Sequence, residues 1–213
     1  MRIRAEHVVW DWNGTLFADN DAVLAAVNRV CADFGHAAVT LEHWRETFSR
    51  PIKDCYERMF GRPLTAADWA RIDTAYHAEY RALVDLCGLA DGVPDHLKAL
   101  RHTQSLLSMW FHDELVPLVA RFGLGELFTR VDGLRTAADG GSKSEHLAVH
   151  LDALDLRPAE VVLIGDVADD AEAARNVGAQ VVLVATGTSS RRVLERTGAP
   201  VADSIPEALA HLA

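Results

Sequence analysis

Short apolar runs and amphipathic segments divide this 213-residue chain into two regions of different pattern. The first apolar run, residues 8–10, ends in Asp11 and is followed by Gly14, where the backbone can turn sharply at little steric cost. From residue 17 to residue 90 the apolar positions recur at helical spacing, and the pattern predicts four helices and no strand. We therefore expect an all-helical insertion after the first strand.

Beyond residue 90 apolar runs alternate with amphipathic segments. The runs predict strands at 104–109, 128–131, 161–164 and 181–184. Strands that alternate with helices are typical of a parallel sheet covered by helices on both faces. The expected fold class is therefore α/β, with a Rossmann-like parallel-sheet core formed by 1–16 and 91–213 and a small helical cap domain at 17–90.

Composition and charge narrow the range of partners. The formal net charge of −10 argues against nucleic acid, although a local pocket could still bind a small phosphorylated ligand. The three cysteines lie far apart and form no CxxC pair, as in a cytosolic protein with reduced thiols. No secretory signal is evident at residues 1–7, and no apolar run approaches the roughly 18 residues of a membrane span. We expect a cytoplasmic monomer or homodimer that acts on a small molecule, without nucleic acid or membrane partners.

Four polar groups, one of them a pair of residues, lie at or just after the predicted carboxyl ends of core elements: Asp11, Ser108, Lys143, and Asp166 with Asp170. Each has a purely structural interpretation, because a strand serine can bond the backbone, a lysine can be solvated and acids can favour a helix N-terminus. Together they place carboxylates and a lysine at one edge of a sheet, where a cation and an anion would have to lie between them. Carboxylates combined with a substrate phosphate are the usual setting for Mg²⁺.

These positions resemble the motifs of the haloacid dehalogenase superfamily, in particular its capped phosphatases of the phosphoglycolate phosphatase-like type. The family's first motif, D-x-D-G-T-L after an apolar strand, corresponds to residues 11–16, which read DWNGTL. Ser108 matches the second motif, and Lys143 matches the third, although Ser144 follows where the family often has proline. The fourth motif, G-D-x-x-x-D, is matched by residues 165–170. The resemblance covers the whole chain.

The resemblance implies a catalytic role for Asp11 and a metal site beside it. Asp11 would attack the phosphoryl group and form an aspartyl-phosphate. The expected Mg²⁺ would be held by the Asp11 carboxylate, the main-chain carbonyl of Asn13 and Asp166. Lys143, positioned by Asp170, would neutralise charge on the nucleophile and the phosphate.

The same resemblance implies a set of substrate contacts. Ser108 and the backbone N–H groups near Trp12, Asn13 and Met109 would bind the oxygens of the transferring phosphoryl group. In the cap, Arg50 and Lys53 could contact a second anionic group, or they could simply be solvated.

Asn13 departs from the family pattern, which usually has an aspartate that protonates the leaving oxygen and then activates the water that releases the enzyme. An amide cannot do so, and loss of a positioned acid typically costs about 10²–10⁴-fold in rate. The enzyme could use leaving groups that need no proton, another group such as His112 could supply it, or the protein could bind phosphorylated ligands with little turnover. We expect Asn13→Asp to raise activity on simple alkyl phosphates.

The expected function is that of a Mg²⁺-dependent phosphatase acting on a small phosphorylated metabolite, with activity weakened or restricted by Asn13. A non-catalytic phospholigand-binding or regulatory protein is the alternative, and a phosphotransferase or phosphomutase is a third possibility.

Overall fold

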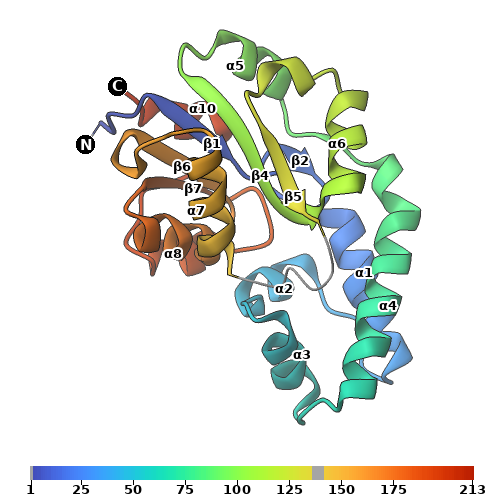
Figure 1. Ribbon diagram of the computed structural model, residues 1–213. Coiled ribbons are helices and arrows are strands. Elements are labelled where there is room, and N and C mark those ends of the chain that lie inside the picture. The colour runs from blue at the N-terminus through green and yellow to red at the C-terminus, as the bar shows by residue number, and fades with distance from the viewer. Residues whose placement is uncertain (1, 136–141) are drawn as a thin grey trace.

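A six-stranded parallel sheet forms the centre of the molecule (Figure 1). The computed structural model describes residues 2–135 and 142–213. The strand order is β5-β4-β1-β6-β7-β8. In chain order the strands are β1 (His7–Trp10), β4 (Thr103–Phe111), β5 (Val131–Leu134), β6 (Val161–Gly165), β7 (Gln180–Val184) and β8 (Val201–Ala202).

The register of the three central strands brings the predicted site together. Trp10, the last residue of β1, pairs with Leu106 of β4 and with Ile164 of β6. The carboxyl ends of β1 and its two neighbours therefore meet at one edge, which is where ligands collect in open α/β sheets. Asp11 follows β1, Ser108 lies on β4 just beyond the paired residues, and Asp166 follows β6.

Helices cover both faces of the sheet because the inward-facing strand residues are apolar on both sides. Val9 and Leu163 pack towards α7 and α8, whereas Val8 and Trp10 belong to the larger cluster that includes residues of α5 and α10 (Figure 1). The core helices are α5 (Val93–Ala99), α6 (His112–Arg121), α7 (Lys143–Ala153), α8 (Ala168–Val177), α9 (Arg191–Glu195) and α10 (Ile205–Ala210). The expected α/β fold with a parallel sheet is confirmed. Within the described parts of the chain, no helix combines the length and apolar character needed to cross a membrane.

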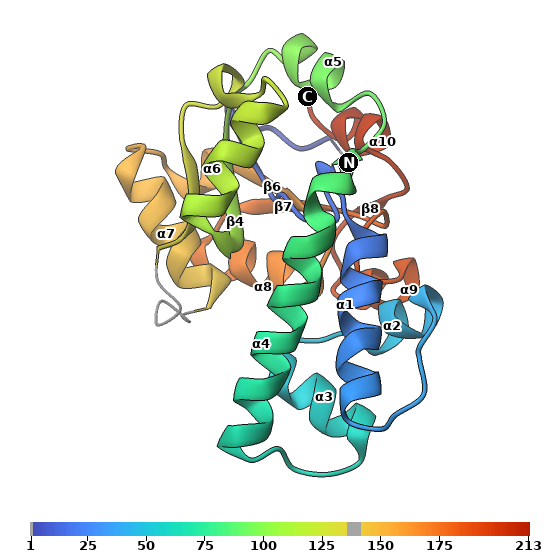
Figure 2. The same ribbon diagram turned by 90° about the vertical axis from the view of Figure 1, so that its right-hand side faces the viewer.

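Four helices form a separate layer beside the carboxyl edge of the sheet. They are α1 (Asn20–Asp33), α2 (Leu41–Thr47), α3 (Ile52–Phe60) and α4 (Ala66–Leu83). Figure 2 shows α1 and α4 packed side by side along their length. Short 3₁₀ turns follow α4 and occur twice in the core, at Val84–Leu86, Gly125–Leu127 and Pro158–Glu160.

A two-stranded antiparallel ribbon joins the helical layer to the core. β2 (Phe17–Ala18) pairs with β3 (Gly88–Leu89). The segment that enters the helical layer therefore lies beside the segment that returns to the core. The expectation of no strand between 17 and 90 was therefore wrong at both ends of this segment. Two-residue strands carry too little alternation to be recognised in a sequence.

Two core strands also differ from the sequence expectation. β5 occupies Val131–Leu134 rather than 128–131, because Phe128 still caps the preceding 3₁₀ turn. β8 was not predicted, since Val201–Ala202 is again only two residues long. Both strands lie at the ends of the sheet, away from the predicted site.

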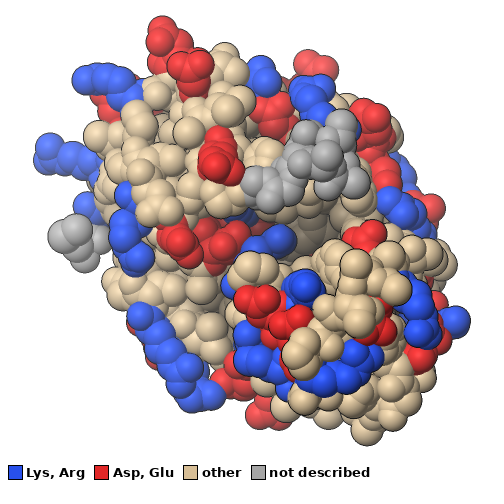
Figure 3. Space-filling view, turned by 60° about the horizontal axis from the view of Figure 1, so that its bottom comes forward, with Lys and Arg blue, Asp and Glu red and all other residues tan. Residues whose placement is uncertain are grey.

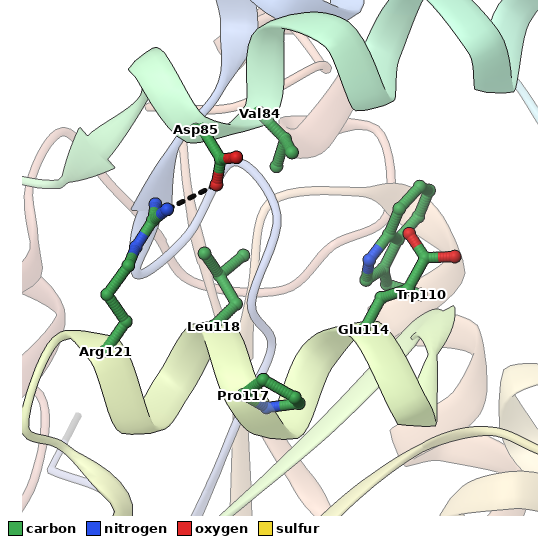
Figure 4. A pocket seen from close by; sticks show the side chains of 7 residues that line it. All are labelled: Val84, Asp85, Trp110, Glu114, Pro117, Leu118 and Arg121. Atoms are coloured by element: carbon green, nitrogen blue, oxygen red, sulfur yellow. Dashed lines mark hydrogen bonds and ion pairs between the residues drawn. The ribbon is translucent and has the colours of Figure 1, made fainter.

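Two ion pairs connect the end of the helical layer to α6. Arg81 of α4 pairs with Glu114 at 2.7 Å, and Arg121 pairs with Asp85 (Figure 4). The side chains between them line a shallow hollow of about 190 Å³, and this lining includes none of the predicted site residues. Because these partners are largely exposed, we expect each pair to contribute little to stability.

Candidate active site

Three buried carboxylates meet at the carboxyl edge of the sheet. Asp11, Asp166 and Asp170 each offer an oxygen, and these oxygens lie within 4.8 Å of one another. Asp11 follows β1, Asp166 follows β6, and Asp170 lies in the first turn of α8. The three side chains belong to residues that are at most 6% exposed, so their charges are poorly screened by solvent.

Lys143 provides the cation that faces this cluster. It is the first residue of α7, whose N-terminus is fixed by a capping box between Ser142 and Glu145. Its Nζ lies 2.9 Å from Asp11 Oδ1 and also pairs with Asp170 Oδ1. Burial lowers the pKa of Lys143, but the charges of Asp11 and Asp170 outweigh that effect and raise the pKa above its ordinary value. Lys143 is therefore a fixed positive charge rather than a proton donor at neutral pH.

Asp166 lies in a pocket of backbone and hydroxyl groups. Its Oδ2 accepts hydrogen bonds from the backbone N–H of Thr188 at 2.7 Å and from the Thr188 hydroxyl at 3.0 Å. A Cβ on Gly187 would overlap this carboxylate, and one on Gly14, which has φ +70°, would lie 2.5 Å from Oδ2. Burial together with the charges of Asp11 and Asp170 raises the pKa of Asp166 well above its ordinary value.

The charges of the cluster fit a divalent cation. Three buried carboxylates face one lysine, which leaves excess negative charge where solvent cannot compensate it. Oxygens within 4.8 Å of one another can share one ion, since Mg²⁺–oxygen bonds are about 2.0–2.1 Å long. Asp170 is already held by Lys143 and by the backbone N–H of Val167, so Asp11 and Asp166 are the better candidates. A second hollow, separate from the one beside α6, lies between the core and the helical layer. Figure 3 shows it with acidic and basic side chains around it.

Asn13 is held by hydrogen bonds on both ends of its amide. Its Nδ2 donates to Asp19 Oδ2 and to the Tyr80 hydroxyl oxygen, each at 2.8 Å. Its Oδ1 accepts a 3.3 Å hydrogen bond from Ser108, whose Oγ in turn accepts from the backbone N–H of Trp110. Asp19 is the N-cap residue of α1, yet its side chain makes no capping bond and is directed at Asn13 instead.

Trp12 and Met109 are placed next to the site by their neighbours. Trp12 is fully buried, and its ring stacks on Phe17 with centroids 5.2 Å apart. The indole therefore packs beneath the ribbon to the helical layer. Met109 follows Ser108 on β4, so its backbone lies at the same edge of the sheet.

The other three predicted substrate contacts, Arg50, Lys53 and His112, have partners outside the carboxylate cluster. Arg50 pairs with Asp169 at 3.7 Å, which brings this helical-layer residue to the first turn of α8, three residues after Asp166. Lys53 pairs with Glu57 one turn along its own helix. His112 accepts a hydrogen bond from the backbone N–H of Gly133 at its Nδ1. Roles for these three residues in substrate binding stay predictions.

Sequence reasoning did not identify Asp19, Tyr80 or Thr188. Thr188 could have been found, because it lies in a short polar loop after β7, at the same edge as the other site residues. Asp19 and Tyr80 carry no such signal. Their contact depends on how α4 packs beside the start of α1.

Comparisons with known proteins agree with this geometry. The family model described as "Haloacid dehalogenase-like hydrolase" matches residues 8–184. Phosphoglycolate phosphatase of Synechococcus elongatus is 26% identical over 192 residues, covering 88% of this chain and 87% of the relative.

Solved structures share the fold at lower identity. A haloacid dehalogenase-like hydrolase from Streptococcus pneumoniae superposes with a TM-score of 0.82 at 18% identity, covering 97% of this chain and 98% of its own. Protein Tyrosine Kinase A of Mycobacterium tuberculosis gives 0.76 at 22% identity, with 97% of both chains covered. These likenesses establish the fold, whereas the reaction has to be argued from the site. On the family match over residues 8–184, the chain belongs to the haloacid dehalogenase-like hydrolases.

Proposed function

We propose that this hydrolase is a Mg²⁺-dependent phosphatase that acts on a small phosphorylated metabolite through phosphorylation of Asp11. The observation that carries the proposal is the buried arrangement of Asp11 between Lys143, at 2.9 Å, and Asp166. A carboxylate next to a fixed positive charge and a second, cation-binding carboxylate suits nucleophilic attack on a phosphoryl group. The 26% identity to a phosphoglycolate phosphatase supports phosphate ester chemistry.

The metal would be held by Asp11, Asp166 and the main-chain carbonyl of Asn13. When bound, Mg²⁺ supplies charge neutralisation at the phosphoryl oxygens. The oxygen donors and the residual negative charge of the cluster fit this hard cation.

The remaining groups position and neutralise the phosphoryl group. Lys143 would offset negative charge on Asp11 and on the phosphate, and Asp170 keeps the ammonium group in place. The Ser108 hydroxyl and the backbone N–H groups of Trp12, Asn13 and Met109 would bind the equatorial oxygens. Most of the rate enhancement in phosphoryl transfer comes from such positioning and charge stabilisation.

We also propose that the helical layer acts as a cap, closing over the site and excluding water. Its contacts with the core support this role. Arg45 of α2 donates hydrogen bonds to the carbonyl oxygens of Thr186 and Gly187. These residues lie in the loop after β7, whose Thr188 donates hydrogen bonds to the Asp166 carboxylate. Arg50 pairs with Asp169 in the first turn of α8, the helix that follows Asp166 in the chain.

Hydrolysis of a panel of alkyl, aryl, acyl and anhydride phosphates, with Mg²⁺ or with EDTA, tests the proposal. We expect phosphate release from at least one class, and only with Mg²⁺. No release from any class, together with retained binding of beryllofluoride, would contradict the proposal and favour a phospholigand-binding protein.

A further inference from the structure

Asn13, Asp19 and Tyr80 form a closed ring of three hydrogen bonds. One Asn13 Nδ2 hydrogen goes to Asp19 Oδ2 and the other to the Tyr80 oxygen, each at 2.8 Å. The Tyr80 hydroxyl completes the ring by donating to the same Asp19 oxygen at 2.7 Å. Asp19 Oδ1 is occupied separately by the backbone N–H of Gly14. Asp19 and Tyr80 are 1% and 2% exposed, so the ring is shielded from solvent on their side.

An amide at position 13 satisfies this ring in full. An amide nitrogen has two hydrogens, and the ring offers two acceptors for them. A carboxylate at position 13 would place an acceptor 2.8 Å from Asp19 Oδ2, where no hydrogen lies between the two oxygens. A buried polar group without a partner costs about 1–3 kcal/mol, and a charged one costs more. Asp19 and Tyr80 therefore favour an amide over a carboxylate at position 13.

The ring also determines what residue 13 can offer to a substrate. Both Nδ2 hydrogens are donated to buried acceptors, and Oδ1 accepts the hydrogen bond from Ser108. We propose that Asp19 and Tyr80 are positioning residues that lock Asn13 as a non-donating amide, and that the substrates are phosphates whose leaving group departs without a proton: acyl phosphates and phosphoanhydrides.

The proton balance of the reaction supports this substrate class. In the first step an oxygen of Asp11 bonds to phosphorus while the bond to the leaving oxygen breaks, and an acyl phosphate releases a stable carboxylate with no proton needed. An alkyl phosphate would release an alkoxide, which has to be protonated as it leaves. In the second step the oxygen of water bonds to phosphorus while the bond between phosphorus and Asp11 breaks, and both water protons leave on the product as dihydrogen phosphate. The carboxylate of Asp11 is regenerated, and no other reactant is consumed.

The unmodified protein provides the first test, and this inference rests on the proposed phosphatase function. We expect kcat/KM for acetyl phosphate to exceed that for phosphoglycolate by about 10²–10⁴-fold beyond the difference in their uncatalysed rates, the usual contribution of a general acid. Equal enhancement of the two substrates would overturn the inference and leave the proposed function intact. Hydrolysis of phosphoglycolate without hydrolysis of acetyl phosphate would likewise overturn the inference alone. Hydrolysis of neither substrate, or persistence of hydrolysis in Asp11→Asn, would contradict the proposed function itself.

A charge swap tests the positioning role of Asp19. In the double variant Asn13→Asp/Asp19→Asn the amide at 19 can donate to the carboxylate at 13, so the ring keeps its hydrogen bonds while residue 13 only accepts and has no proton to give. Asn13→Asp alone places two carboxylates against each other, and Asp19→Asn alone places two amide groups together. Two neighbouring carboxyl groups favour a proton on one of them, whereas the swapped carboxylate holds none. We therefore expect Asn13→Asp alone to raise the ratio of phosphoglycolate to acetyl phosphate turnover at least tenfold more than the swap does.

Asp21→Asn serves as the matched control, because Asp21 is an exposed acid in the first turn of the same helix. We expect this variant to leave the ratio unchanged. A swap that behaves like Asn13→Asp alone, with both variants folded by circular dichroism, would overturn the positioning role of Asp19. An equal change of the turnover ratio in Asp21→Asn would overturn it as well. The change would then come from the loss of any negative charge near the start of α1, not from the contact with Asn13.

Discussion

Replacement of Lys143 by methionine tests the electrostatic account of the site through protein stability. The Lys143 side chain is 3% exposed, and its ammonium group is shared by Asp11 and Asp170. Lys143→Met leaves the carboxylate cluster buried without its cation. Removal of one partner of a buried ion pair typically costs about 3–5 kcal/mol, because the remaining charge is uncompensated. For a chain of this size that corresponds to a fall in Tm of roughly 6–20 °C.

Urea unfolding followed by circular dichroism in EDTA measures this loss without interference from bound metal. The double variant Lys143→Met/Asp170→Asn removes one of the stranded charges, so we expect it to be more stable than Lys143→Met alone by at least about 1 kcal/mol. Mg²⁺ should also stabilise Lys143→Met, since the cation replaces part of the lost positive charge. The reasoning would be refuted if Lys143→Met lowered the free energy of unfolding by less than about 1 kcal/mol. It would also be refuted if the loss in the double variant equalled the sum of the losses in Lys143→Met and Asp170→Asn.

Three further predictions follow from other parts of the structure. Gly187→Ala should weaken Mg²⁺ binding, measured by calorimetry, because a Cβ there would overlap the Asp166 carboxylate; Gly125→Ala, where a Cβ meets nothing within 4 Å, should leave Mg²⁺ binding unchanged. Asp166→Asn should abolish the rise in Tm that Mg²⁺ produces in the native protein, and an undiminished rise would exclude Asp166 as a ligand. Burial, together with the charge of His150, lowers the pKa of His7 to about 4, so the unfolded chain binds a proton that the folded chain excludes. Stability should therefore fall as pH drops from about 6.5 towards 4, by up to about 1.4 kcal/mol per pH unit from this group, and His7→Gln should show a shallower fall in urea midpoint.

The core of the site was predictable because its residues follow a rule of sheet architecture. Asp11 and Asp166 each come directly after an apolar run, and the parallel register of β1 and β6 brings their carboxylates together. Lys143 was predictable from its place just after a capping serine, and the structure brings it to Asp11 and Asp170.

The surroundings of Asn13 were not predictable in this way. Asp19 looks like an ordinary helix N-cap in the sequence, and Tyr80 lies 61 residues further along, among the aromatic residues of α4. Their contact with Asn13 depends on the packing of α1 against α4 and on the β2–β3 ribbon that carries both. Local patterns contain no information about such packing, so the hydrogen bonds of Asn13 could only be seen in three dimensions.

Trapping of phosphorylated Asp11 is the most direct test of the proposed mechanism. The native protein would be mixed with acetyl phosphate and Mg²⁺, quenched in acid and reduced with borohydride, which converts an aspartyl-phosphate to homoserine. Mass spectrometry of the peptide that contains residue 11 should then show homoserine at that position, and Asp11→Asn should show neither the label nor Mg²⁺-dependent turnover. Phosphate release by the native protein without modification of Asp11, or retention of more than a few per cent of activity in Asp11→Asn, would contradict the account.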